Sequence, residues 1–449
     1  MLNALANPVD SGRIGSYWPL LVFGLYVVYM VTALTLPFVG RVSAGCLLLA
    51  GWVGLYGAKG GLYAFTRSEK YILASFVLFT LISIISFFYW PHTRLARIHL
   101  EDYGTFMLLL PLYVLLRQFQ FNFTNMLVLL ASIALLVGVV SIVQYVAMRY
   151  YHIQILTSDS VYSKMWGRPS GGVNPMRYGA ISLVLSAIAF NGVLLVKCKA
   201  TLRGGLCLSS FMGLVACYLT DTRGSFLAIP VLALMYGVYL YKSGHPRFLM
   251  GLIVVSTLLM AGLSQNDRVK ATVLSFDSYQ QGNAASSLGA RFDMFKAAII
   301  LIEKKPVWGY GLGGYLEGGK EVRKMYPDIE QHVGTWSNPH NEILLVMVEK
   351  GIFGLISLLL LFAAPAYLFF RALKRADDSS AGQQTKFYAM SGLSLLVVYA
   401  VVGQSVALFQ HDVFNHFFTL MVLLFASQIR VIGYMGGRAA GGSSEEGVV

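Results

Sequence analysis

Charged residues are scarce in this chain, since Asp, Glu, Lys and Arg make up only 12% of its 449 residues, whereas 56% are hydrophobic. A soluble protein of this length would carry about 25% charged residues. Cysteine is rarer still, with four in the whole chain and none between residues 265 and 340. This polar stretch therefore has no disulfide to hold it. The connections expected to face outward also lack an Asp-x-Asp pair, which is the usual way to hold a divalent metal against a diphosphate. We therefore expect neither a soluble domain nor a metal or other cofactor site.

Long apolar runs dominate what is present. Windows of about 20 apolar residues recur along most of the chain, and this pattern is typical of membrane helices. The sequence therefore predicts an all-α polytopic membrane protein with about 12 transmembrane helices. The expected spans are 17–36, 39–57, 70–90, 104–117, 125–147, 177–196, 204–220, 224–241, 247–264, 341–370, 387–409 and 413–434.

These spans divide the chain into four parts. Residues 1–264 hold nine helices, 265–340 form one large loop, 341–434 hold three helices, and 435–449 are expected to be a disordered cytoplasmic tail. The short connections on the side of both termini carry about twice as many Lys and Arg residues as those on the other side. Because positive residues stay in the cytoplasm, both termini are predicted to be cytoplasmic and the large loop periplasmic, in a bacterial inner membrane.

The outer face is nonetheless basic, and the whole chain has a formal net charge of +13. Such a face indicates a polyanionic partner. The two alternatives are anionic lipid headgroups and a phosphate-bearing substrate.

The stretch Asn338-Pro339-His340-Asn341-Glu342 precedes the tenth predicted span. Asn338 is a suitable N-cap and Pro339 suits the first helical position, which would place His340 and Asn341 second and third in the helix. The positive end of the helix dipole disfavours imidazolium there, and a neutral imidazole is what a general base requires. The alternative is a capping-region histidine with a purely structural role. The same Asn-Pro pair recurs at 174–175, followed by Arg177.

Four further arginines stand near the predicted outer face. Arg223 lies in a tight turn between two apolar spans, where Asp221 could pair with it, and Arg291 opens a predicted amphipathic helix. Arg94 and Arg97 lie between the third and fourth spans with His99. The guanidinium fork suits phosphate oxygens better than a Lys ammonium does. The structural alternatives are an internal ion pair for Arg223, a snorkelling surface cation for Arg291, and headgroup contacts for Arg94 and Arg97.

The large loop has its own internal pattern. Residues 291–305 show the spacing of an amphipathic helix, which we expect to lie in the membrane interface, and Pro306 ends it. The glycine run 309–314 follows, but no strand precedes it and no Lys-Ser or Lys-Thr closes it, so a phosphate-binding loop is disfavoured. His411 and His416 flank Asp412, but nothing completes a set of metal ligands.

Several of these motifs together resemble the O-antigen ligase and polymerase superfamily. The resemblance rests on four separated motifs in the expected order, and it covers roughly residues 165–430. Two departures are Ile343, where many members have an aromatic residue, and the pair Asp221-Thr222, where small hydroxyl residues are common. The motifs are Thr-Arg-Gly at Arg223, the arginine at 291, Pro306-Val307-Trp308-Gly309-Tyr310-Gly311-Leu312-Gly313, and His340-Asn341-Glu342-Ile343-Leu344 with Glu349-Lys350-Gly351-Ile352-Phe353-Gly354.

The resemblance implies a metal-independent, inverting glycosyltransferase with a fold similar to the GT-C class. Its donor would be a glycan on undecaprenyl pyrophosphate, and its acceptor a sugar hydroxyl of lipid A-core. His340 would take the proton of the acceptor hydroxyl, while Arg223 and Arg291 would bind the pyrophosphate. Asn341 would orient His340 or cap the helix, and Arg177, Arg94 and Arg97 would support the site.

Three hypotheses stay open beside one another. An O-antigen ligase is favoured over an O-antigen polymerase or an O-linked protein glycosyltransferase of the same superfamily. A transporter of lipid-linked glycans is disfavoured, because the polar groups gather at one face rather than at the midplane of inverted repeats. Membrane lipids are expected partners and nucleic acid is not.

Overall fold

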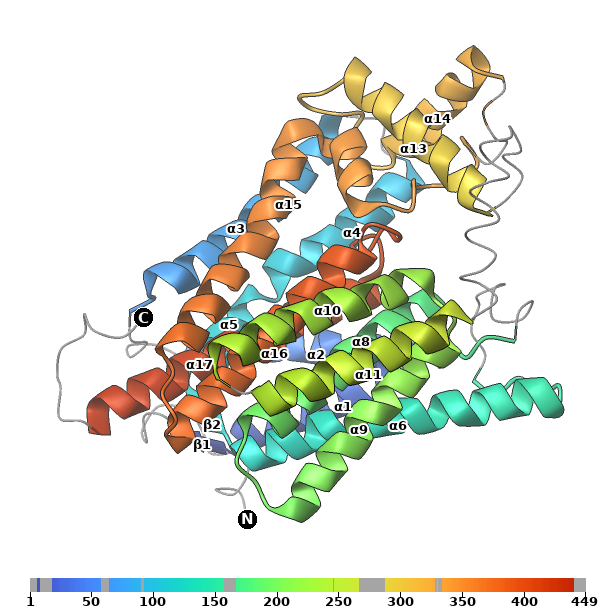
Figure 1. The fold of residues 1–449 in the computed structure, drawn as a ribbon. Helices are drawn as coiled ribbons and strands as arrows, with labels where there is room; N and C mark the ends of the chain where they lie inside the picture. The colour runs from blue at the N-terminus through green and yellow to red at the C-terminus, as the bar shows by residue number, and fades with distance from the viewer. Residues whose placement is uncertain are drawn as a thin grey trace.

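The computed structural model describes residues 6–8, 18–57, 64–89, 93–156, 167–244, 246–265, 287–327, 329 and 333–439. These residues form an almost entirely helical molecule (Figure 1). In chain order the elements are β1 (Ala6–Pro8), α1 (Trp18–Thr32), α2 (Pro37–Gly57), α3 (Arg67–Tyr89), α4 (Arg94–Leu108), α5 (Leu110–Leu116), β2 (Phe119–Phe121), α6 (Phe123–Tyr150), α8 (Pro175–Leu195), α9 (Ala200–Leu219), α10 (Arg223–Lys242), α11 (Pro246–Ser264), α13 (Ser287–Lys304), α14 (Gly314–Met325), α15 (Glu342–Arg375), α16 (Ser380–Val402) and α17 (Asp412–Ala439).

Nine helices in the described part of the chain are long and apolar enough to cross a membrane, namely α2, α3, α6, α8, α9, α10, α15, α16 and α17. The prediction of an all-α, multi-pass membrane protein is therefore confirmed. Each of the predicted spans overlaps a helix, and α1 is a shorter apolar helix. The total of twelve spans and the periplasmic position of the large loop stay predictions. α17 continues to Ala439 and so includes the first residues of the predicted C-terminal tail, 435–449. The rest of that tail lies outside the described residues.

The fourth predicted span, 104–117, is wrong as a single helix. α4 ends at Leu108 and α5 begins at Leu110, with Pro111 in the first turn of α5. A proline in the first turn loses no helical hydrogen bond, whereas inside a continuous helix its ring would clash with the preceding turn. The chain therefore breaks before Pro111.

Small residues allow the central helices to pack closely. On α9, a Cβ added to Gly213 would lie 2.8 Å from Cβ of Ser186 on α8. Lipid tails give apolar helices little hydrophobic reason to associate, so close backbone approach and hydrogen bonds between helices replace it. Asn191 of α8 accordingly donates to the hydroxyl of Ser391 on α16 at 3.2 Å.

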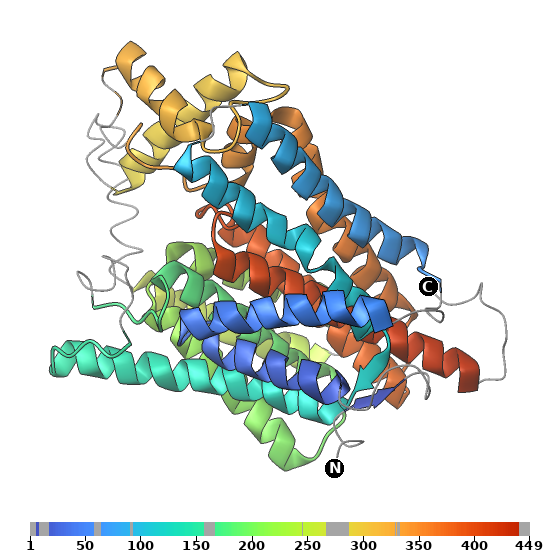
Figure 2. The ribbon, with the colours of Figure 1, turned by 180° about the vertical axis from the view of Figure 1, so that it is seen from behind.

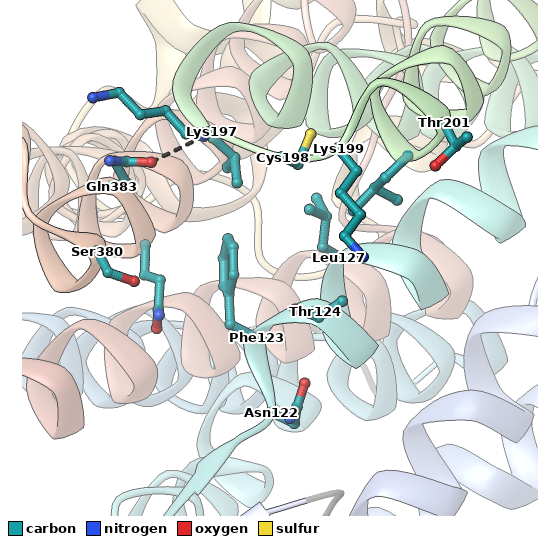
Figure 3. A pocket seen from close by; sticks show the side chains of 13 residues that line it. Asn122, Phe123, Thr124, Leu127, Lys197, Cys198, Lys199, Thr201, Ser380 and Gln383 are labelled. Carbon is teal, nitrogen blue, oxygen red and sulfur yellow. Dashed lines mark hydrogen bonds between the residues drawn. The ribbon is translucent and has the colours of Figure 1, made fainter.

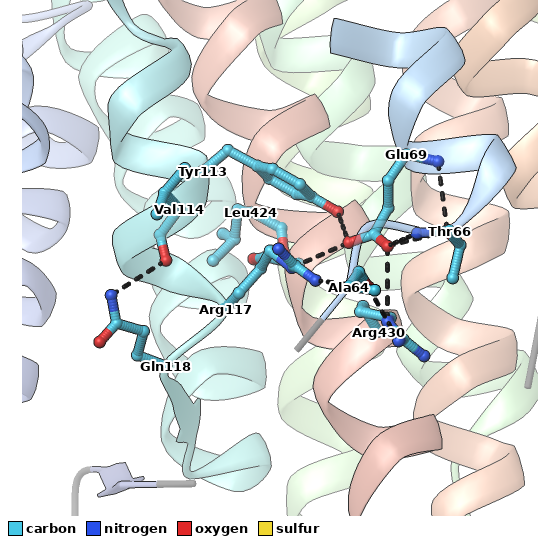
Figure 4. A network of polar contacts seen from close by, with 10 residues as sticks. Ala64, Thr66, Glu69, Tyr113, Val114, Arg117, Gln118, Leu424 and Arg430 are labelled. Carbon is cyan, nitrogen blue, oxygen red and sulfur yellow. Dashed lines mark hydrogen bonds and ion pairs between the residues drawn. The ribbon is translucent and has the colours of Figure 1, made fainter. Parts of the chain in front are cut away.

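One buried carboxylate ties together three helices at one end of the bundle (Figure 4). Glu69 of α3 lies 2.9 Å from Nε of Arg117, which follows α5, and 3.4 Å from Nε of Arg430 on α17. The hydroxyl of Tyr113 donates to the same carboxylate at 2.8 Å. A buried charge is stable only when partners of this kind surround it, so this cluster has a structural role.

The two ends of the bundle are chemically different. We call one end of the bundle the His340 end. α8 begins there and α16 finishes there, and Glu342 N donates to the carbonyl oxygen of Gly403 at 2.7 Å. At the opposite end, a cavity of about 610 Å³ lies between the end of α8 and the starts of α6 and α16 (Figure 3). There, Lys197 N donates to Oε1 of Gln383 at 2.9 Å. This cavity is separated from His340 by the length of α8 and α16.

α15 is not one continuous helix. Gly351 has φ 60° and ψ −153°, which divides the helix into a first piece, 342–350, and a second piece, 352–375. A Cβ at Gly351 would lie 2.1 Å from the carbonyl oxygen of Val307, so both the backbone angles and the space require glycine. The predicted span 341–370 is therefore corrected, because residues 342–350 form a separate helical piece (Figure 1).

α13 and α14 lie together at the His340 end, beside the first piece of α15 (Figures 1 and 2). Met294, Ala297 and Leu301 of α13 are buried in one cluster with Tyr315 of α14 and Leu345 of α15. The predicted amphipathic helix is confirmed as a helix, and one of its faces packs on protein. This packing holds the predicted large loop to the bundle without a disulfide.

Candidate functional site at the His340 end

His340 lies in a turn before α15 and not inside the helix. Its φ is +54°, and its backbone N–H donates to Oδ1 of Asn338 at 3.0 Å. The helix begins at Glu342, and its cap is Asn341, whose Oδ1 accepts from Leu344 N at 3.0 Å. The expected cap at Asn338, with His340 in the first helical turn, is therefore wrong, whereas the capping role of Asn341 is confirmed.

The physical reason lies in what an asparagine side chain can bind. It can accept from a backbone N–H two residues later in a turn that does not continue as a helix. Asn174 and Pro175 do open α8, with Pro175 in the first turn and Asn174 accepting from Met176 N. Asn338 makes the same contact with the N–H two residues later, but its Nδ2 also donates to Oε1 of Gln410 at 3.0 Å, so a tertiary contact holds this turn.

The imidazole of His340 is held neutral. Burial, and secondarily the charge of Arg291, lower the pKa of His340 from 6.5 to about 4. The ring of Trp336 packs edge-on against the imidazole at a centroid distance of 4.8 Å and contributes to this burial. A neutral imidazole can accept a proton, as the sequence predicted, and burial and the charge of Arg291 account for the lowered pKa.

Arg291 reaches this site from α13. It lies in the first part of that helix and is partly buried. α13 packs on the first piece of α15 through the cluster described above, and this packing brings Arg291 within electrostatic reach of His340. Residues 49 positions apart are thereby placed together, although no local pattern links them.

Arg223 is linked to His340 through the turn that follows α16. A Cβ added to Gly224, the residue after Arg223, would lie 2.0 Å from Oγ of Ser405. On the other side of this turn, Nδ2 of Asn341 donates to the carbonyl oxygen of Gln404 at 3.3 Å. The start of α10 and the His340 segment therefore contact the same three-residue turn.

Arg168 holds the turn before Arg223, although its sequence context marks it only as one more basic residue. Nε and Nη2 of Arg168 donate to the carbonyl oxygens of Thr220 and Asp221 at 2.7 and 2.9 Å. Asp221 has φ +52°, an unusual angle for a residue other than glycine. Arg168 therefore stabilises the strained turn that presents Arg223.

Arg177 lies at the same end and contacts His411, the last residue of the connection between α16 and α17. Its Nη2 lies 2.9 Å from Nδ1 of His411, and burial together with Arg177 lowers the pKa of His411 well below 6.5. Asp412 pairs with Arg41 rather than with a histidine. Within the described residues no group of three or more His, Cys, Asp or Glu side chains could hold a metal ion.

The structure separates Arg94 from Arg97. Both lie in the first turn of α4 and are exposed. Arg94 lines a cavity of about 520 Å³ together with Trp336, the residue that packs on His340, whereas Arg97 does not line it. His99, expected beside them as a surface group, is only 2% exposed.

His99 instead belongs to a buried polar network behind the site. Its Nδ1 lies 3.1 Å from Oε1 of Glu349 and 3.2 Å from Nε2 of Gln410. Gln410 in turn accepts from Asn338, so the network ends at the His340 turn. Glu349 therefore has its polar partners within the protein. A charged pair inside an apolar run was a signal for Glu349 and Lys350, but no sequence signal pointed to Gln410.

The glycine run 309–314 supports this network. Gly311 N donates to the carbonyl oxygen of Glu349 at 2.9 Å, and Gly313 N donates to the Glu349 carboxylate at 2.8 Å. Gly309, Gly311 and Gly313 all have positive φ. These two amides bind α15, which fits the expectation that the run is no phosphate-binding loop.

Comparison with known proteins relates the sequence of this chain to one family. The family model described as O-antigen ligase matches residues 208–359, a segment that contains Arg223, Arg291 and His340. An uncharacterised protein of Haemophilus influenzae is 23% identical over 375 residues, covering 81% of this chain and 87% of that protein. An O-antigen ligase of Escherichia coli K12 is 25% identical over 221 residues, which cover 46% of this chain and about half, 51%, of the ligase. The resemblance of this chain to the O-antigen ligase family, first indicated by its separated motifs, is thereby confirmed.

Proposed function

We propose that this protein is an O-antigen ligase, which transfers a glycan from undecaprenyl pyrophosphate to a sugar hydroxyl of lipid A-core. The observation that carries the proposal is the neutral imidazole of His340, held beside Arg291 and joined to the Arg223 turn. The match to the O-antigen ligase family supports an activity of the ligase or polymerase type.

In the proposed reaction His340 is the general base. The acceptor O–H bond breaks as its proton moves to the imidazole, and the oxygen forms a bond to the anomeric carbon of the donor. The bond from that carbon to the phosphate oxygen breaks, and its electron pair leaves with undecaprenyl pyrophosphate. Attack opposite the leaving group inverts the anomeric configuration. A positioned base of this kind contributes about 10²- to 10⁴-fold to a rate.

Arg223 and Arg291 would stabilise the leaving pyrophosphate. Two guanidinium groups offer paired donors that match phosphate oxygens, and they are positioned before charge develops. Within the described residues, no group of three or more His, Cys, Asp or Glu side chains could hold a divalent metal. We expect a chelator such as EDTA to leave transfer unchanged, and inhibition that added magnesium reverses would contradict a metal-independent mechanism.

We place the His340 end on the periplasmic side of a bacterial inner membrane, with both termini in the cytoplasm. The distribution of Lys and Arg supports this orientation. The donor and the acceptor are both lipid-anchored, so a site at the end of the bundle would meet them at the membrane surface.

Reconstitution tests the proposal. Purified protein in liposomes is supplied with undecaprenyl-pyrophosphate glycan and lipid A-core, and the products are separated by size and by lipid. His152→Ala is the matched control for His340→Ala, because His152 is an exposed histidine with the same φ of 54° on the segment after α6. We expect glycan on lipid A-core with wild type and His152→Ala, and a loss of at least about 10²-fold with His340→Ala.

The products also separate the alternatives. Longer glycans that remain on the polyprenyl carrier would assign the protein to the polymerase branch. Glycan on an added protein acceptor would indicate an O-linked protein glycosyltransferase. Transfer by His340→Ala at the wild-type rate would refute His340 as the base.

A further inference from the structure

A cavity opens beside His340 between α4, α14 and the segment before α15. It is an open hollow in the surface, with a volume of about 520 Å³. Ile98 and Leu316 form part of its apolar lining, and the indole of Trp336 forms another part. Ile98 is 42% exposed.

The cavity is adjacent to the proposed base through one side chain. Trp336 both lines the cavity and packs on the imidazole of His340 at 4.8 Å between ring centroids. A pyranose presents apolar C–H groups on its faces and hydroxyls around its edge. The face of an indole carries negative potential and suits such C–H groups. A sugar stacked on Trp336 would therefore place its edge hydroxyls toward His340.

The polar part of the lining favours a negatively charged ligand. Arg94 lines the cavity with Thr335 and Ser337, and none of the described lining residues is acidic. The N-termini of α4 and α14, which are capped by Thr93 and Gly313, lie beside the cavity and close to each other. A Cβ added to Gly313 would be 3.3 Å from Ala96 N. The helix dipoles at both starts add to the charge of Arg94.

The position of the cavity indicates which substrate would occupy it. In an inverting displacement the acceptor attacks opposite the leaving group, and the base lies on the acceptor side. Trp336 joins this cavity to the base, whereas Arg223 and Arg291, which would bind the pyrophosphate, do not line it. The cavity therefore lies on the acceptor side of His340.

We propose that this cavity binds the acceptor sugar, stacked on Trp336, and that Arg94 selects an acceptor whose sugar carries a phosphate or carboxylate group. Calling this sugar the acceptor rests on the proposed function. The predicted binding of the sugar can nevertheless be measured without any glycan transfer. Arg94 would be a specificity-determining residue, and Trp336 the stacking platform.

Binding is measured on full-length protein in nanodiscs of zwitterionic lipid, without any donor. The probes are delipidated core oligosaccharide with its phosphates and the same oligosaccharide after dephosphorylation. Arg94→Gln is compared with Arg97→Gln, which removes the same charge from the same exposed helical turn but outside the cavity. Trp336→Leu and Trp336→Tyr test the stacking, since tyrosine keeps an aromatic face.

We expect Arg94→Gln to weaken binding of the phosphorylated probe about tenfold, the size of one lost charge-assisted hydrogen bond, and to leave binding of the dephosphorylated probe unchanged. Arg97→Gln should not change binding of either probe. Trp336→Leu should weaken binding of both probes, and Trp336→Tyr should restore most of it.

Equal losses with Arg94→Gln and Arg97→Gln would reduce the effect to general surface charge and overturn the proposal. Loss of Arg94-dependent binding in nanodiscs of anionic lipid would identify a lipid headgroup as the occupant and also overturn it. Binding as expected, with no glycan transfer in the reconstitution, would refute the proposed function and leave the sugar site standing. Transfer without selective binding would do the reverse.

Discussion

The pH dependence of transfer gives the sharpest test of the His340 assignment. Burial and Arg291 lower the pKa of this imidazole to about 4, so the group stays in its neutral, proton-accepting form far below the usual pKa of 6.5. At pH 5.5 about 97% of a group with a pKa near 4 is neutral, compared with about 9% for a pKa of 6.5. The two cases differ about tenfold in active base.

The assay is kcat/KM for glycan transfer in liposomes between pH 4.5 and 8, because this ratio reports the pKa of the free enzyme. We expect less than about a twofold loss from His340 protonation over this whole range, because about three quarters of a group with a pKa near 4 is still neutral at pH 4.5. A decline centred near pH 6.5 would refute the reasoning, because it would mean that His340 is solvated and ordinary.

Arg291→Gln tests the cause of the shift. Removing a positive charge makes imidazolium easier to form, so the pKa of His340 should rise and the acid decline should move to higher pH. Because burial is the larger cause, the pKa should stay below 6.5. NMR titration of labelled histidine, with His340→Ala to assign the signal, measures this pKa even where transfer is slow.

Three further predictions concern single residues. Arg223→Lys should lower transfer about 10- to 100-fold with unchanged yield, because an ammonium cannot replace the two parallel bonds of a guanidinium fork; an unchanged single-turnover rate would contradict this. Gln410→Leu should destabilise the protein by about 1–3 kcal/mol, because it leaves Asn338 without its buried partner; thermal denaturation in detergent checks it, and an unchanged midpoint would count against the network. Gly351→Val should prevent correct folding, because its φ of 60° and the carbonyl of Val307 leave no room for a side chain; a monodisperse product at wild-type yield would show that reasoning to be wrong.

Hydropathy in the sequence was enough for the membrane class and for most helix positions. Each span requires about 20 apolar residues in a row, and this condition is local, so a window along the chain detects it. The fourth predicted span is wrong for a local reason as well. Hydropathy does not distinguish a continuous helix from one interrupted before Pro111.

The residues of the proposed site were accessible from the sequence, because His340, Arg223 and Arg291 lie in recognisable motifs. Their assembly was not. The turn at residues 403–405 contacts Gly224 and Asn341, which follow Arg223 and His340 in the chain, and Arg291 comes near His340 because α13 packs on α15. Contacts between segments this far apart depend on the packing of whole helices, and no single segment encodes them.

Local rules even gave the wrong answer where tertiary contacts competed with them. The pair Asn174-Pro175 opens a helix, whereas Asn338-Pro339 forms a turn, because Gln410 binds the side chain of Asn338. The low pKa of His340 likewise arises from burial and from Arg291, which is distant in the sequence but near in space. The sequence by itself determined which groups lie at this end of the protein, and only the tertiary structure decided their protonation and their neighbours, because burial and electrostatic contact are properties of the packed chain.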